Sequence, residues 1–128
     1  MNNSPKRKAN ICELSHIVAT CALILALSGI SANAETVNVK YRGPVNIDAF
    51  DCPALKPSSV VNRICYHEPT RYLIVQLRST YYHYCEVGQN VVAAWVAAPS
   101  LGQFYNANIK VSSNGGLYDC RGKELPQF

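Results

Sequence analysis

The stretch Tyr81–Val87 concentrates aromatic rings, a histidine and a cysteine. In an extended strand His83 and Cys85 lie two residues apart and therefore share a face. A histidine base beside a thiol can generate a thiolate nucleophile, but no clear third group is present to orient this histidine. The nearby carboxylates have no spacing that specifies an acid–base pair: Asp48, Asp51, Glu68 and Glu86. We therefore expect no catalytic residues and no cofactor.

Tyrosines and arginines gather in and around the same stretch: Tyr66, Tyr72, Tyr81, Tyr82, Tyr84, Arg71 and Arg78. One interpretation is a platform on which bases stack, with arginines at the phosphates. The other is cross-strand aromatic pairing that stabilises a small sheet. Side chains alternate along a strand, so Tyr82 and Tyr84 point away from Tyr81, His83 and Cys85, and the rings cannot share one platform. Our candidates for ligand or partner contact are Tyr82, Tyr84, Arg71, Arg78 and Lys110.

The amino-terminal segment has the pattern of a secretory signal peptide. Lys6, Arg7 and Lys8 supply the positive region, and Ile17–Ile30 is an uncharged, mostly apolar run that is short for a membrane span. Ala32-Asn33-Ala34 then places small residues three and one before a cut. We predict that residues 1–34 are removed after Ala34, which leaves no stable membrane anchor. An uncleaved anchor is the alternative.

The predicted mature chain has only a modest positive charge. It keeps nine Lys and Arg against seven Asp and Glu, a net charge of +2, compared with +4 for the whole chain. Domains that bind nucleic acid through its phosphates usually carry a stronger basic excess. The charge therefore argues weakly against nucleic acid as the partner.

Four cysteines remain after the predicted cleavage: Cys52, Cys65, Cys85 and Cys120. An even number in a small exported protein indicates two disulfides, and four cysteines allow three pairings. We predict Cys52–Cys120, which ties the ends of the domain together, and Cys65–Cys85 inside it. A metal site is the alternative, but there is no C-x-x-C pair and the histidines lack zinc-site spacing, so we expect no metal.

Alternating apolar residues predict three strands, over Val60–Tyr66, Arg71–Arg78 and Tyr81–Glu86. The short connections between them favour an antiparallel meander. In the second strand Ile74 is an apolar exception on the outer face. Residues 35–57 are predicted to be an irregular lead-in. Within it, Val37, Val39 and Tyr41 allow a short edge strand, which Gly43-Pro44 interrupts.

Gly88–Ala98 is predicted to form a helix that Pro99 ends. No residue from Gln89 to Ala98 is charged, so this helix needs cover on a second face, from the carboxyl-terminal tail or from another molecule. Ser100–Lys110 should form a short helical or irregular segment. The predicted fold class is α+β: a three-stranded antiparallel meander packed by one main helix and stapled by disulfides.

Several motifs follow one another along the chain: Ser58-Ser59, Ile64-x-Tyr66, Leu73-x-Val75-x-Leu77, Tyr82-x-Tyr84 and Ala98-x-Ser100-x-Gly102-x-Phe104-Tyr105-Asn106-(2)-Ile109-Lys110. Together they resemble the KTSC domain, which occurs at the carboxyl end of some lysyl-tRNA synthetases and as a stand-alone bacterial protein. The resemblance covers residues 58–112 and leaves 113–128 as a tail bearing Cys120. Its motif residues here are Ser59, Tyr66, Ser100, Gly102, Phe104 and Asn106.

The chain departs from the family pattern at several positions. Cys65 replaces a usual glycine, Ser79-Thr80 lacks another, and Cys85 directly follows the Y-x-Y motif. These cysteines and the export signal suggest a secreted branch stiffened by a disulfide. In a strict meander Cys65 and Cys85 lie on non-adjacent strands, so a bond between them would need a strongly twisted sheet.

These observations predict an exported bacterial binding module, secreted or periplasmic and without catalytic activity. Its partner would be an unknown protein or an envelope component. The alternative is RNA or single-stranded nucleic acid, the activity suggested for the family that the chain resembles. Ser100, Gly102 and Asn106 could line a pocket, but we favour a role in shaping the backbone, with a positive φ at Gly102.

Overall fold

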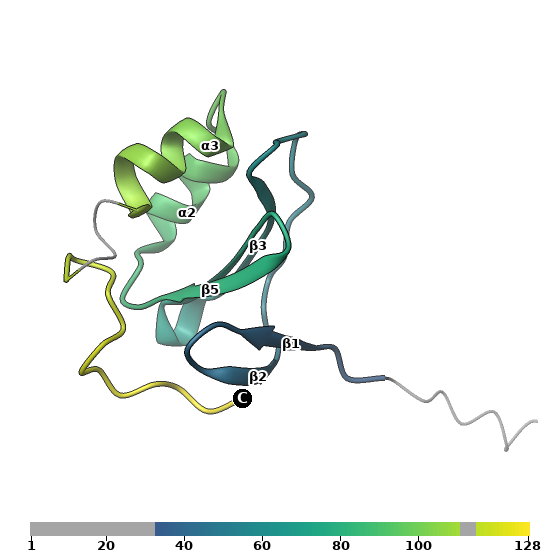
Figure 1. The fold of residues 1–128 in the computed structure, drawn as a ribbon, viewed down its shortest axis with the longest axis vertical. Helices are drawn as coiled ribbons and strands as arrows, with labels where there is room; N and C mark the ends of the chain where they lie inside the picture. The colour runs from purple at the N-terminus through teal and green to yellow at the C-terminus, as the bar shows by residue number, and fades with distance from the viewer. Residues whose placement is uncertain (1–32, 111–114) are drawn as a thin grey trace, which may run out of the picture. The chain divides into compact units, whose positions relative to one another are not determined.

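The computed structural model of the protein describes residues 33–110 and 115–128, and Ala34–Phe128 forms one compact unit (Figure 1). The predicted signal peptide lies outside the described residues except for Asn33 and Ala34. The elements are β1 (Thr36–Val39), β2 (Gly43–Asn46), β3 (Val61–His67), η2 (Glu68–Thr70), β4 (Tyr72–Leu77), β5 (Thr80–Tyr84), α2 (Gln89–Val96), α3 (Leu101–Phe104) and η3 (Tyr105–Lys110).

The strands form one five-stranded sheet in the order β2-β1-β5-β4-β3. β3, β4 and β5 pair antiparallel, as in the predicted meander. β1 pairs antiparallel with β2 and parallel with β5, where Val39 lies opposite Tyr81. The α+β class is therefore confirmed, whereas the prediction of three purely antiparallel strands is wrong.

The two additional strands come from the predicted lead-in. Val37, Val39 and Val45 are buried, which gives the segment the alternation of a hairpin with one covered face. Tyr41 and Gly43 have φ angles of 68° and 99°, so the glycine belongs to the tight turn of this hairpin and does not end the strand pattern. Proline next to that turn is tolerated because β2 is an edge strand.

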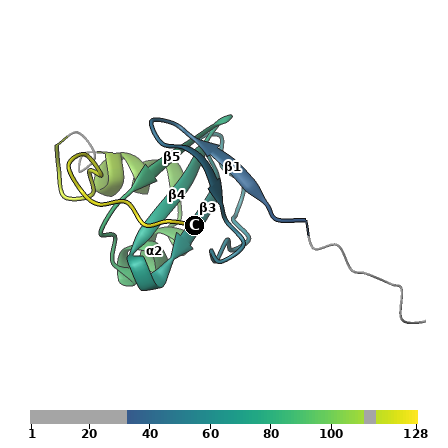
Figure 2. The ribbon, with the colours of Figure 1, turned by 90° about the horizontal axis from the view of Figure 1, so that it is seen from below.

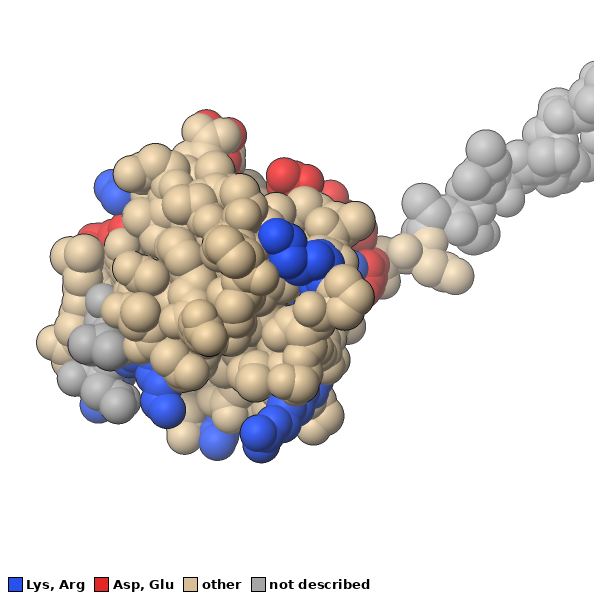
Figure 3. Space-filling model, turned by 90° about the horizontal axis from the view of Figure 1, so that it is seen from above, with Lys and Arg blue, Asp and Glu red and all other residues tan. Residues whose placement is uncertain are grey.

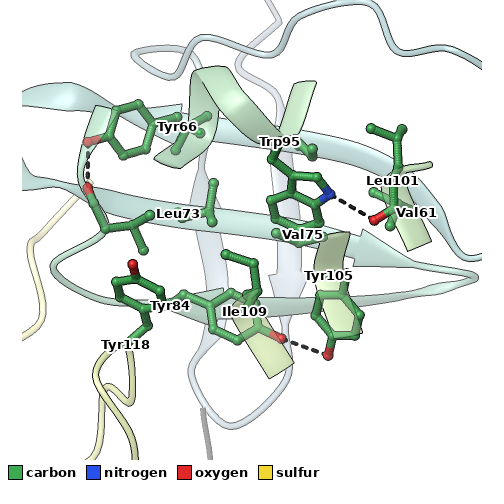
Figure 4. Packing of buried hydrophobic residues seen from close by; sticks show 13 residues of the cluster. Val61, Tyr66, Leu73, Val75, Tyr84, Trp95, Leu101, Tyr105, Ile109 and Tyr118 are labelled. Atoms are coloured by element: carbon green, nitrogen blue, oxygen red, sulfur yellow. Dashed lines mark hydrogen bonds between the residues drawn. The ribbon is translucent and has the colours of Figure 1, made fainter. Parts of the chain in front are cut away.

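The helices cover one face of the sheet, above it in Figure 1. Leu73 and Val75 of β4 and Trp95 of α2 are buried there (Figure 4). The Nε1 of Trp95 donates a hydrogen bond to the carbonyl of Leu101 (2.9 Å), and its ring lies 6.0 Å from the ring of Tyr105. This layer was expected from the apolar spacing in the sequence.

A second core lies on the opposite face of the sheet. Figures 1 and 2 show the β1–β2 hairpin and the carboxyl-terminal segment on the side away from the helices. Its buried residues are Val37, Val39, Val45, Ile47, Phe50, Cys65, Tyr72, Ile74, Cys85 and Cys120. Ile74 is therefore a core residue of this second layer and not an exception on an exposed face.

Arg42 holds the carboxyl-terminal segment against the second core. Its guanidinium carbon lies 4.8 Å from the centroid of the Tyr72 ring and 5.5 Å from that of Phe128. One of its amino groups donates to the carbonyl of Pro126. Phe128 also packs against Phe50, with the ring centroids 4.7 Å apart. The cation–π contacts on two rings help to offset the partial burial of the guanidinium.

Two disulfides tie the flanking segments to the sheet. Asp51 exchanges backbone hydrogen bonds of 2.9 and 2.8 Å with Tyr66 of β3, and the next residue, Cys52, is bonded to Cys65, with 4.2 Å between their Cα atoms. The second bond joins Cys85, at the end of β5, to Cys120 across 5.1 Å.

The predicted pairs Cys52–Cys120 and Cys65–Cys85 are therefore wrong. β4 lies between the strand that carries Cys65 and the strand that leads to Cys85. Two strand spacings amount to about 9.5 Å, beyond the roughly 7 Å that a disulfide spans between Cα atoms. Cys65 of β3 instead bonds to the segment that precedes this strand, and Cys85 bonds to the carboxyl-terminal segment.

The outer face of α2 is open to solvent. Ala93, Ala94 and Ala97 are exposed, and nothing in the described segments covers them. The carboxyl-terminal segment contributes Tyr118 to the first core and Leu125 to the second. The sequence left open whether the carboxyl-terminal tail or another molecule covers this helix. The described part of the tail does not cover its outer face.

The disulfide pattern can be tested by mass spectrometry of the non-reduced, digested protein. We expect linked peptides containing Cys52 with Cys65 and Cys85 with Cys120. Replacing both members of a pair by serine should lower the free energy of unfolding by about 3 kcal/mol for the first pair and about 4 kcal/mol for the second, measured in urea, because the closed loops span 13 and 35 residues. A peptide linking Cys52 to Cys120 would contradict the structure.

Candidate ligand-binding pocket

Three of the five predicted contact residues lie around one pocket at the β4–β5 turn. Tyr82, Arg78 and Lys110 line this pocket, which has a volume of about 360 Å³. Tyr105 of η3 and residues of the turn complete the lining. No lining residue is acidic, so the pocket combines aromatic rings with cations and has no carboxylate.

The turn that carries Arg78 is held in place by the start of β3. Arg78 adopts a φ of 54°, its backbone N–H donates to the carbonyl of Val60 (2.8 Å), and its own carbonyl accepts from the Asn62 side chain (2.7 Å). Alternation along β5 then turns Tyr82 towards the face that η3 covers. The start of β3, the β4–β5 turn and β5 all belong to one sheet, which fixes these three sides of the pocket relative to one another.

A hairpin residue that sequence reasoning missed adds another cation. The Nζ of Lys40 lies 5.5 Å from the centroid of the Tyr82 ring and 5.0 Å from that of Tyr41. Tyr41 is 85% exposed at the tip of the β1–β2 hairpin. Lys40 also lines a wider depression between β1 and β5, about 670 Å³ in volume, which shares Ser79 and Thr80 with the pocket. Recognising the hairpin from its buried valines would have brought Lys40 into consideration.

The structure buries Tyr84, the second tyrosine of the Y-x-Y motif. Only 4% of Tyr84 is exposed, and its hydroxyl hydrogen-bonds that of Tyr105 at 3.1 Å (Figure 4). Burial, followed by this hydrogen bond, raises the pKa of Tyr84 well above the ordinary tyrosine value. Tyr84 supports the wall of the pocket through Tyr105 and does not face a ligand.

Arg71 lies at the other end of β4 and takes no part in the pocket. It follows η2 with a φ of 54°, and its side chain donates to the carbonyl of Glu86 (3.1 Å). Its own carbonyl accepts from the N–H of Val87 (3.0 Å). These contacts give Arg71 a role in joining the β3–β4 connection to the segment that precedes α2.

Most of the motif residues of the sequence shape the backbone and the core. Ser100 caps α3 by accepting from the N–H of Gln103 (3.3 Å), and Tyr66 donates to the carbonyl of Val87 (2.6 Å). Phe104 stacks on Trp95, with centroids 6.0 Å apart. Gly102 lies within α3 and is not among the positive-φ glycines, so the expectation of a positive φ at Gly102 was wrong. Ser59 and Asn106 are exposed.

His83 and Cys85 lie on the second face of the sheet, as alternation predicted. Nδ1 of His83 is 2.7 Å from the hydroxyl of Tyr72, and burial, followed by the nearby Arg42, lowers the pKa of His83. Cys85 is bonded to Cys120, which removes the thiolate that nucleophilic catalysis would need.

These features define a small α+β domain with a mixed sheet, one helical layer and an aromatic pocket at a sheet turn. Residues 57–112 match the family model of the KTSC domain, which confirms the resemblance that the sequence motifs indicated. The crystal structure of a KTSC domain protein from Yersinia pestis is 28% identical, over 48% of this chain and 87% of that one, with a TM-score of 0.45. The search of curated proteins finds no match.

The buried Tyr84 predicts how stability depends on pH. A tyrosine with a raised pKa favours folding below about pH 10, where the unfolded chain is also neutral, and this contribution is lost as the pH rises further. Tyr84→Phe should lower the free energy of unfolding at pH 7 by about 1 kcal/mol, through the lost hydrogen bond, and should flatten the decline above pH 10. Urea unfolding between pH 7 and 11 measures both effects. An unchanged decline would contradict the assignment.

Proposed function

We propose that this protein is an exported, non-catalytic binding module that captures a negatively charged segment of another protein or an envelope component at the Tyr82 pocket. The observation that carries the proposal is the chemistry of the pocket lining. Arg78 and Lys110 flank an aromatic ring, Lys40 lies over that ring, and no carboxylate lines the pocket. An anion in the pocket gains Coulomb attraction from these cations, and no lining carboxylate repels it.

The positive charge is local and not a property of the whole unit. Residues 35–128 have a net charge of only +2, and three of their acidic residues pair with Arg63, Arg121 and Lys123. Among the described residues, Lys40 and Arg78 form none of these three ion pairs. Such a local concentration selects an acidic surface by complementarity and does not attract polyanions in general.

Export is part of the proposal. The two disulfides suggest an oxidising, non-cytoplasmic environment. The predicted signal peptide at residues 1–34 supplies the route. In the part of the chain that the structure describes, no helix is long and apolar enough to cross a membrane.

Nucleic acid is the second candidate, because a tyrosine ring beside cations can stack on a base. Two observations weigh against it. Tyr84 is buried, so the pocket offers Tyr82 and not a run of exposed rings. The modest net charge provides few phosphate contacts beyond the pocket.

The proposed partner can be sought by affinity capture from an envelope extract. Tyr82→Ala and Arg78→Gln should each weaken the captured complex by about fivefold or more, since one removes the ring and the other a cation from the pocket. Arg71→Gln is the matched control, because it removes an arginine that lies at the other end of β4 and does not line the pocket. A partner indifferent to both pocket substitutions would refute the proposal.

A parallel titration with oligouridine at two salt concentrations distinguishes the two candidates. Salt-dependent binding that Tyr82→Ala abolishes would favour nucleic acid over an acidic protein surface. The proposed function expects no such binding at the concentrations that saturate the captured partner.

Export predicts a defined amino terminus. The protein recovered from the producing bacterium should begin at Glu35, because the small residues of Ala32-Asn33-Ala34 fit the cleavage site. Intact-mass measurement of the periplasmic and culture fractions checks this expectation. Protein that retains its first residues and accumulates in the cytoplasm would contradict it.

A further inference from the structure

A second concave surface lies between α2 and the segment that precedes β3, away from the Tyr82 pocket. This groove has a volume of about 610 Å³. Ala93, Val96 and Ala97 of α2 form one side of it, and Tyr66 and Val92, both buried, also line it. Pro53 contributes to the lining from the segment before β3. The lining is therefore largely apolar.

The wall that faces α2 is held rigidly by covalent and hydrogen bonds. Asp51 is joined to Tyr66 by two backbone hydrogen bonds, and the Cys52–Cys65 disulfide fixes the next residue to β3. The Tyr66 hydroxyl in turn donates to the carbonyl of Val87, just before α2. A groove formed before binding loses little conformational entropy when it is filled.

One wall of the groove lies outside the part of the chain that matches the family model. The wall that contains Asp51 and Pro53 precedes the family match, which begins at residue 57. The disulfide that fixes this wall uses Cys52, which also precedes the match.

Two carboxylates give the groove its charge. Asp51 and Glu68 line it, and no cationic residue does. Within the described ranges, the ion pairs of the chain involve Glu35, Glu86 and Asp119, and neither groove carboxylate takes part. The helix that forms the other side carries no charge at all. The face of the molecule seen from above is mostly uncharged, apart from one group of basic atoms within it and charged residues along its margins (Figure 3).

We infer that this groove binds a segment of another protein in which apolar side chains alternate with, or adjoin, lysine or arginine. The apolar side chains bury the exposed alanines and the valine of α2, and the basic side chains pair with Asp51 and Glu68. This inference does not depend on the function proposed for the Tyr82 pocket, which has the opposite charge and selects a different partner surface.

The test uses the purified, oxidised protein and three short fluorescent peptides. One alternates leucine with lysine, the second replaces lysine by glutamate, and the third replaces leucine by serine. The leucine–lysine peptide should bind at least about tenfold more tightly than either of the others, measured by fluorescence anisotropy, because only it satisfies both the apolar lining and the carboxylates. Equal binding of all three peptides, or binding of none, overturns the inference.

Matched substitutions locate the binding. Asp51→Asn combined with Glu68→Gln should weaken the leucine–lysine peptide by about three- to tenfold and reduce its salt dependence. Ala93→Gln, which fills the groove, should weaken it by a similar factor, whereas Ala94→Gln changes an exposed neighbour that does not line the groove and should have no effect. Equal effects of the two alanine substitutions would place the peptide elsewhere and refute the inference.

A second copy of the chain is the competing occupant. Its exposed Tyr41, next to Lys40, carries both an apolar ring and a cation. Light scattering at increasing protein concentration detects such self-association. A dimer or larger assembly that Ala93→Gln and Tyr41→Ser both dissolve would overturn the assignment of the groove to another protein.

Discussion

The structure depends on the burial of β4 on both faces. Leu73 and Val75 pack under the helices, while Tyr72 and Ile74 pack into the second core. A three-stranded meander with one helical layer would leave Ile74 in water and expose a contiguous apolar face. The hydrophobic effect therefore requires a second layer, and the rest of the fold supplies it.

That second layer is made from the segments that flank the family domain. The β1–β2 hairpin precedes the matched residues, and the segment from Cys120 to Phe128 follows them. The hairpin joins the sheet through the pairing of β1 with β5, and disulfides at Cys52, after the hairpin, and at Cys120 tie the flanking segments to the rest of the domain. Arg42 adds a bond between the two segments, since it lies over Tyr72 and Phe128 and donates to Pro126.

A core closed on both faces also determines where binding surfaces can form. The basic pocket lies beyond the carboxyl end of β4, around the turn that carries Arg78. The acidic groove reaches η2, at the amino end of the same strand. Two surfaces of opposite charge therefore lie at the two ends of one central strand.

The sequence by itself determined the local elements and the resemblance to the KTSC domain. Alternation predicted β3, β4 and β5 to within one or two residues, Gly88 and Pro99 bounded the helix, and the motifs indicated the KTSC domain. Of the contact candidates, Tyr82, Arg78 and Lys110 line one pocket, and their role in binding stays a prediction.

Only the tertiary structure decided the remaining features, because each depends on contacts between segments far apart in the chain. The parallel pairing of β1 with β5 leaves no local pattern, and the disulfide partners follow from which segments the fold brings beside Cys65 and Cys85. Tyr84 and Tyr82 look equivalent in a Y-x-Y motif, yet packing against Tyr105 buries one and leaves the other at a pocket. The hairpin brings Lys40 to the Tyr82 pocket, and the bridge between Asp51 and Tyr66 brings Asp51 to the groove beside α2. The periodicity of the sequence does not encode either contact.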